Sequence, residues 1–156
     1  MTVNRGRVLL GGVLGGVAWF IWSFISGQFI IGNARYAAAQ NAGLFLKQPR
    51  YPFFVVQWFV ILVLISIVLA HLYAWSRQIL GAGPGTALKV GLMVGFAASF
   101  PMNFSLATWS PVERTFPLGW MLDIWVGCIL ATFVAGWIYK DATETRPASM
   151  AGKAGH

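Results

Sequence analysis

The stretch FVILVLISIVLAHL, residues 59–72, decides the fold class because its large apolar side chains run almost without interruption. Crossing the hydrocarbon core of a membrane takes about 20 apolar residues in a helix. This run extends to Pro52 on one side and to Trp75 on the other, so it is long enough to cross. Only helices and closed barrels satisfy their backbone in lipid, and barrel strands would alternate apolar with polar residues. The stretch therefore predicts a membrane-spanning helix.

Working outward, the same criterion selects three more stretches, which gives spans at about residues 8–31, 52–75, 86–109 and 117–139. We expect an all-α integral membrane four-helix bundle over residues 1–140, with both termini on the same side. Residues 141–156 are polar and predict a disordered tail. Arg5 and Arg7 precede the first apolar stretch, as in a signal peptide. That stretch exceeds the roughly 7–15 residues of a signal sequence, which favours a retained span.

The composition agrees with lipid as the solvent. The chain has 156 residues, of which 58% are hydrophobic and 10% charged, whereas soluble domains carry about 25% charged residues. This balance excludes a disordered chain and makes a soluble globule a poor fit. The single cysteine excludes an internal disulfide. The bilayer itself is therefore the first expected partner.

The distribution of cations predicts the orientation. The side that holds both termini carries seven Lys and Arg residues and the other side carries four. Because Lys and Arg collect on the cytoplasmic side, we expect both termini in the cytoplasm, in a bacterial inner membrane. The net charge of +7 is spread over both sides, whereas nucleic-acid binding needs a concentrated basic face. We expect no nucleic-acid partner.

Small and polar residues recur at every fourth position in the last two spans. Residues four apart share a helix face, and small residues let helix backbones approach closely in membranes. We expect these two faces to meet in a tight hairpin, with Asn103 hydrogen bonded to Asp123 at a similar depth. The two sets are Gly91, Gly95, Ser99 and Asn103, then Asp123, Gly127, Ala131 and Ala135.

Polar residues of the first two spans lie at the same predicted level, so we expect a shared cluster around Asp123 that includes Ser23, Ser26 and Gln57. A carboxylate inside a span usually faces the bundle interior and has a partner. Two interpretations stay open. One is a proton or ligand site, and the other, which we favour, is a structural network that fixes how the helices pack.

The first span carries Gly11, Gly12, Gly15 and Gly16, which form a helix-association face. Packing within the chain is favoured, and self-association or contact with another membrane protein is the alternative.

His71 is a possible ligand or relay, because intramembrane histidines make polar contacts. As a haem ligand it would need a second histidine from a partner chain. We expect no catalytic residue, no metal and no cofactor, and an exposed Glu113–Arg114 pair.

Two motifs near the chain ends carry a resemblance. They are the basic, glycine-rich start Arg7-Val8-Leu9-Leu10-Gly11-Gly12 and the last span, with Trp120-Met121-Leu122-Asp123 and Gly136-Trp137-Ile138-Tyr139. In these features the chain resembles small uncharacterised bacterial four-span integral membrane proteins. The resemblance implies a fold and no activity.

Together these observations predict a non-catalytic structural or accessory subunit of a membrane complex, or a homo-oligomer. The alternative is a small proton-coupled transporter or channel-like protein that uses Asp123. A third, weaker hypothesis is a membrane enzyme or cofactor carrier that uses His71.

Overall fold

The computed structural model describes residues 3–140, so the predicted tail lies outside the described residues. Within them every regular element is a helix and there is no strand. The helices are α1 (Arg5–Ser26), which continues into a π-helix η1 (Gly27–Ile31), then α2 (Asn33–Asn41), α3 (Phe54–Leu80), α4 (Pro84–Trp109) and α5 (Thr115–Ile138). Four of these segments are long and apolar enough to cross a membrane. The predicted all-helical fold with four apolar spans is confirmed, and it indicates an integral membrane protein.

The helix ends follow from local chemistry. Asn4 precedes α1 and its side chain accepts a hydrogen bond from the backbone N–H of Arg7 at 3.2 Å, which satisfies one of the free donors of the first turn. Gly32, with φ of 84°, separates η1 from α2, since glycine adopts positive φ without penalty. Pro84 begins α4, where a missing backbone N–H costs nothing.

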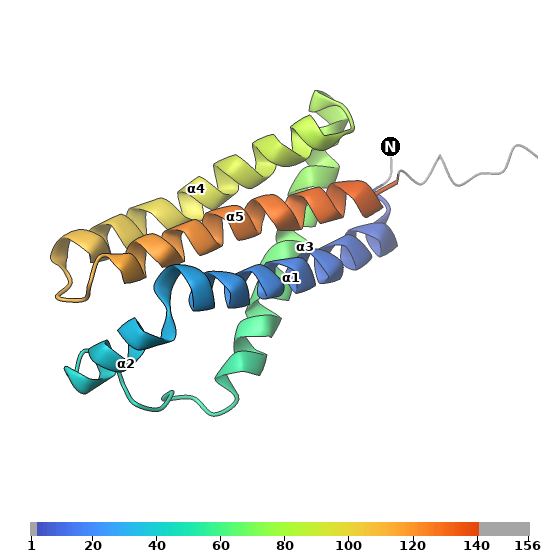
Figure 1. Cartoon of the computed structure of the whole chain (residues 1–156). Helices are drawn as coiled ribbons and strands as arrows, with labels where there is room; N and C mark the ends of the chain where they lie inside the picture. The colour runs from blue at the N-terminus through green and yellow to red at the C-terminus, as the bar shows by residue number, and fades with distance from the viewer. Residues whose placement is uncertain (1–2, 141–156) are drawn as a thin grey trace, which may run out of the picture.

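Three of the long helices form a layer, and the fourth crosses it (Figure 1). Helix α5 lies between α1 and α4, while α3 packs across α1 and α5. We call the end with Arg5, Leu80 and Ile138 the proximal end, and the end with Ile31, Phe54 and Thr115 the distal end. The backbone N–H of Asn4 donates to the Tyr139 hydroxyl at 3.3 Å, so both ends of the described chain lie at the proximal end.

Helices α4 and α5 form the predicted tight hairpin, but the face of α5 that carries Asp123 meets α1 and not α4, which corrects the predicted pairing of faces. A Cβ built on Gly11 would lie 3.1 Å from the Cα of Ala135, and one on Gly15 would lie 2.9 Å from the Ala131 carbonyl oxygen. Further along, the Trp19 indole packs directly on Gly127, and Ser23 reaches Asp123. The two helices are therefore antiparallel, and every fourth residue of α1 contacts every fourth residue of α5 in reverse order.

Helix α4 does pack closely on α5, but against a different face. Cβ atoms built on Gly91 and Gly95 would come within 3.0 Å of α5, mainly at Ile129 and Trp125. Helix α5 thus has small or adaptable residues on two sides. The sequence analysis assigned the face with Asp123 to α4, which was wrong. The closest residues on this second face are Trp125, Cys128, Ile129 and Thr132.

The remaining glycines of α1 face α3. A Cβ on Gly12 would lie 2.6 Å from the Cα of Ile67, and one on Gly16 would lie 2.6 Å from the Cα of Val63. All four glycines of the predicted association face are therefore packed within the chain. This close crossing lies near the middle of α3, and it determines where the two helices separate.

Candidate functional site

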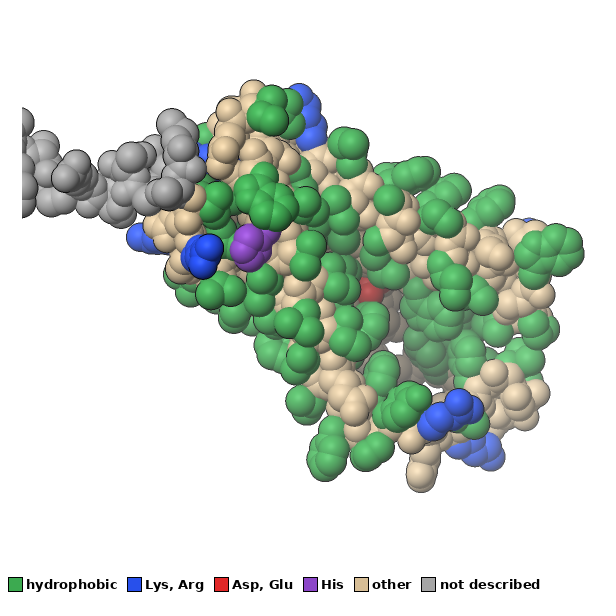
Figure 2. Space-filling model, turned by 180° about the vertical axis from the view of Figure 1, so that it is seen from behind, with side chains coloured by type: hydrophobic (Ala, Val, Ile, Leu, Met, Phe, Trp, Pro, Cys, Tyr) green, Lys and Arg blue, Asp and Glu red, His purple; other side chains and the backbone are tan. Residues whose placement is uncertain are grey.

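A cavity of about 710 Å³ lies in the distal half of the bundle, between α1, α3, α4 and α5. It opens on the face shown in Figure 2, where a red carboxylate is visible in a hollow among hydrophobic side chains. We call it the distal cavity. Its lining consists of Phe20, Ser23, Phe24, Ser26, Gly27, Ile31, Tyr36, Phe54, Val55, Trp58, Ala98, Met102, Asn103, Trp120, Asp123 and Ile124.

The cavity exists because α1 and α3 diverge beyond their close crossing. After Gly16 the next residue on this side of α1 is Phe20, whose ring meets Phe59 of α3 edge-on at 5.3 Å between centroids. Two aromatic rings hold the helix backbones further apart than a glycine does. The buried residues of α3 begin only at Leu62, so its first two turns stand away from the rest of the bundle.

Asp123 lies in the cavity wall and is held by α1. The Ser23 hydroxyl lies 2.9 Å from Oδ1 and 3.0 Å from Oδ2 of Asp123, and donates its hydrogen bond to this carboxylate. Only 8% of Asp123 is exposed. The predicted hydrogen bond from Asn103 is not formed. Instead, the Asn103 amide donates to the Ser99 carbonyl oxygen one turn earlier in its own helix, at 2.8 Å.

The other residues of the predicted polar cluster are divided. Ser26 lines the cavity and is 1% exposed, and no described residue forms a hydrogen bond with its hydroxyl. Ser99 is buried behind Asn103, and its hydroxyl also lacks a partner. Gln57 is exposed on α3 and is not among the lining residues. The structure therefore brings together Asp123, Asn103, Ser23 and Ser26 at the cavity and leaves Gln57 out.

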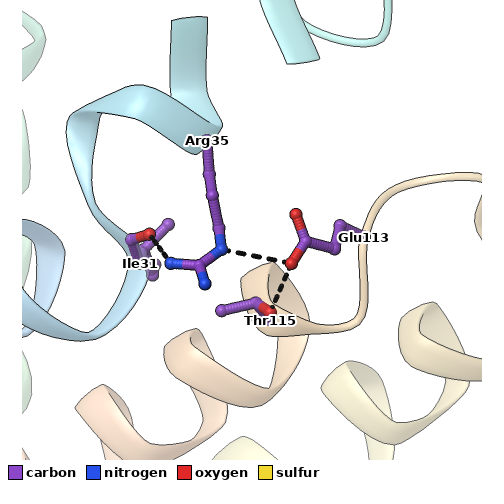
Figure 3. Close-up of polar contacts among 4 residues, drawn as sticks. All are labelled: Ile31, Arg35, Glu113 and Thr115. Carbon is purple, nitrogen blue, oxygen red and sulfur yellow. Dashed lines mark hydrogen bonds and ion pairs between the residues drawn. The ribbon is translucent and has the colours of Figure 1, made fainter. Parts of the chain in front are cut away.

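The distal rim is held by a polar contact and an aromatic cluster. Arg35 Nε lies 3.1 Å from Glu113 Oε1, and Arg35 Nη1 donates to the Ile31 carbonyl oxygen at 2.9 Å (Figure 3). The Thr115 hydroxyl donates to the same carboxylate oxygen at 2.7 Å. The predicted exposed pair of Glu113 with Arg114 is therefore replaced by a link between α2 and the loop before α5.

Beside that link, aromatic rings fix α2 and the following loop to the start of α5. The Phe116 ring lies 5.0 Å from the Tyr36 ring and 4.9 Å from the Phe45 ring. The Trp120 indole N–H donates to the Tyr36 hydroxyl at 3.3 Å. Tyr36 and Trp120 also line the cavity, so this cluster forms its distal wall.

His71 lies apart from this site. It faces a separate hollow at the proximal end, together with Arg5 and Trp75. Its Nδ1 lies 2.9 Å from the Ile67 carbonyl oxygen, so this nitrogen must donate there. Within residues 3–140, no group of three or more His, Cys, Asp or Glu side chains is placed to hold a metal ion.

The aromatic wall is what sequence reasoning missed. Phe20, Phe24, Phe54 and Trp58 were assigned only to spans and their boundaries, although two pairs four residues apart were a readable signal. Comparison of the sequence with protein-family models, curated proteins and solved structures finds no match.

Proposed function

We propose that this chain is a non-catalytic integral membrane protein that holds a lipid-soluble molecule in the distal cavity. The cavity itself is the observation that supports this proposal. Its volume of about 710 Å³ falls in the range of small-molecule sites, which are mostly apolar with a few placed polar groups. Here the polar groups are Asp123, Asn103, Ser23 and Ser26, and the rest of the wall is largely apolar or aromatic.

A filled cavity tests the proposal directly. Ala98 lines the cavity and is exposed, so Ala98→Trp would place an indole in it. Ala97 is equally exposed on α4 but is not among the lining residues, so Ala97→Trp is the matched control. Native mass spectrometry in a gentle detergent should detect a bound molecule in the wild type and in Ala97→Trp, and none in Ala98→Trp. Equal occupancy in both variants would refute the proposal.

As a non-catalytic protein, the chain would act as an accessory component that supplies the held molecule to a neighbouring membrane protein. Association through the glycine face of α1 is not part of the proposal, since these glycines pack against α3 and α5. Gentle purification should recover a second membrane protein with the chain. Recovery of the chain as a clean monomer would contradict the accessory role and leave the binding role standing.

A second candidate is proton-coupled transport, and it is favoured by the placement of Asp123 in the cavity wall. A single titratable carboxylate that borders an intramembrane cavity is a common feature of ion pathways. In liposomes, Asp123→Asn should then abolish a proton-driven flux while the amount of incorporated protein stays unchanged. An unaltered flux would exclude Asp123 as the coupling residue.

We further propose that all four helices cross a bacterial inner membrane with both termini in the cytoplasm. The meeting of Asn4 with Tyr139 at one end of the bundle supports a common side. The excess of Lys and Arg on that side supports the cytoplasm. Labelling of Ala148→Cys by an impermeant thiol reagent on intact cells would contradict this topology.

A further inference from the structure

We propose that the molecule held in the distal cavity is an organic cation, with one ammonium nitrogen on an apolar alkyl or arylalkyl body. This inference rests on the proposed function and adds the charge and chemical class of the ligand. It is carried by three features of the wall: its acidic residue, its aromatic rings and its unpartnered hydroxyl.

The wall carries one acidic side chain and no basic one. Asp123 is the acidic residue, and none of the lining residues, all within residues 3–140, is Lys, Arg or His. The Ser23 hydroxyl has a single hydrogen to share between the two carboxylate oxygens, while a carboxylate has about four acceptor positions. The carboxylate therefore keeps capacity for a donor that enters the cavity, and a cation is the complementary one.

Arg35, a cation of the distal rim, is already engaged. Arg35 contacts the Glu113 carboxylate and the Ile31 carbonyl oxygen. About half of its side chain is exposed, as is that of Glu113, so water screens this pair. Arg35 therefore does not supply the positive charge that the cavity lacks.

Aromatic side chains surround the space beside the carboxylate. The face of an aromatic ring attracts a cation within about 6 Å of its centroid, and cages of such rings recognise ammonium groups. The same rings bury the apolar body of a ligand. A neutral apolar ligand would use the rings and leave the carboxylate with Ser23 as its one donor among residues 3–140. The aromatic lining residues are Phe20, Phe24, Tyr36, Phe54, Trp58 and Trp120.

Ser26 adds an independent sign that something polar enters. Ser26 is 1% exposed in the cavity wall, and its hydroxyl has no hydrogen-bond partner among residues 3–140. Buried hydroxyls nearly always have one. A primary or secondary ammonium adds N–H donors for the free acceptor positions of Asp123, whereas a quaternary ammonium would use the charge and the rings alone.

The test uses the full chain in nanodiscs of zwitterionic phosphatidylcholine, so that lipid charge does not concentrate the cation. The probes are phenylbutylammonium, which carries N–H donors, and its neutral isostere phenylpentane, in which carbon replaces the nitrogen. Binding is measured by equilibrium dialysis against empty nanodiscs. We expect the cation to bind at least about ten-fold more tightly than the isostere.

Two variants separate the charge of Asp123 from its role in the fold. Asp123→Asn should weaken cation binding about ten-fold and leave isostere binding unchanged, since the amide keeps the shape and loses the charge. Lys89→Gln changes the charge by the same one unit on an exposed residue of α4 that does not line the cavity, and it should change cation binding less than about two-fold, because exposed charges are screened. The melting temperature of each variant checks that it is folded.

Each outcome has one meaning. Equal binding of the cation and the isostere, both lost in Ala98→Trp, would overturn the cation and leave the cavity as a binding site. An equal loss of both probes in folded Asp123→Asn would also overturn the cation. Binding of neither probe above the empty nanodisc would overturn this inference, whereas the proposed function depends on the mass-spectrometric comparison of Ala98→Trp with Ala97→Trp.

Discussion

Helix α1 contacts two neighbours with opposite results. Along α5 it is closely packed at four successive positions, from Gly11 and Ala135 to Ser23 and Asp123. Along α3 it is equally close at Gly12 and Gly16, and then an aromatic ring takes the next position. The α1–α5 interface stays closed, and the α1–α3 interface opens into the distal cavity.

The difference teaches that the residue at every fourth position decides whether two membrane helices stay together. Lipid provides no hydrophobic driving force between helices, so close packing and hydrogen bonds have to do so. On α5, a glycine faces the one large residue of the α1 seam, Trp19. On α3, Phe59 faces Phe20, ring against ring. Large residues on both sides separate the backbones and leave space.

The largest expected effect comes from breaking the close part of the α1–α3 interface. In Gly16→Leu the new side chain would meet the backbone of Val63, so we expect a loss of about 3 kcal/mol in stability. Gly27→Leu is the control, because a Cβ there has nothing within 4 Å, and it should change stability little. Thermal unfolding in detergent measures both. Similar losses in the two variants would mean that Gly16 is not a close contact.

The next effect comes from the closed α1–α5 interface. Gly127→Ala would place a methyl group into the Trp19 indole, which is 1% exposed, and should lower stability by about 2 kcal/mol. Combining it with Trp19→Phe should restore part of the loss, since the smaller ring leaves room for the methyl group. If the two losses simply add, the indole does not lie on Gly127.

A smaller effect is expected for the polar end of the same interface. A double-mutant cycle of Ser23→Ala with Asp123→Asn should give a coupling free energy of about 1 kcal/mol, as for hydrogen bonds between membrane helices. The matched cycle of Asn103→Ala with Asp123→Asn should give almost none, because Asn103 donates to Ser99. The reverse result would restore the hairpin contact predicted from the sequence.

The smallest effect is expected at the rim. Arg35 and Glu113 are both about half exposed, and pairs of this kind contribute at most about 1 kcal/mol. A cycle of Arg35→Gln with Glu113→Gln should give about 0.5 kcal/mol, and less in high salt. A coupling that is larger and independent of salt would show that the rim pair is shielded from water.

The spans could be predicted from the sequence because lipid imposes a simple requirement of length and apolarity, which residues 59–72 meet plainly. The pairing of faces could not, because α5 has small or adaptable residues on two sides. Periodicity places Asp123, Gly127 and Ala131 on one face, yet it does not say whether α1 or α4 meets that face. Asn103 and Asp123 both line the cavity, as their similar predicted depth implies, but Asp123 forms its hydrogen bond with Ser23 of α1 and not with Asn103.

The cavity was beyond the same reasoning for a different reason. It depends on the angle between α1 and α3, which follows from the contacts of Gly12, Gly16 and Phe20 taken together. Gln57 illustrates this. Its depth matched that of Asp123, but the first turns of α3 stand away from the bundle, so Gln57 is exposed. The depth of a residue along its helix can be read from the sequence. Which neighbouring helix its side chain faces depends on how the helices pack.

The π-helix at Gly27–Ile31 has a consequence for helical phase. One residue advances an α-helix by about 100°, and a π-turn holds an extra residue. Everything after Ser26 is therefore rotated relative to an uninterrupted α-helix. Deleting one residue within 27–31 would leave the first span apolar and nearly as long, but it would turn Ile31, Arg35 and Tyr36 away from α5. The π-turn thus changes the direction in which the residues after Ser26 face, although it hardly changes the length or the hydropathy of the first span. The contacts of the distal rim depend on this rotation.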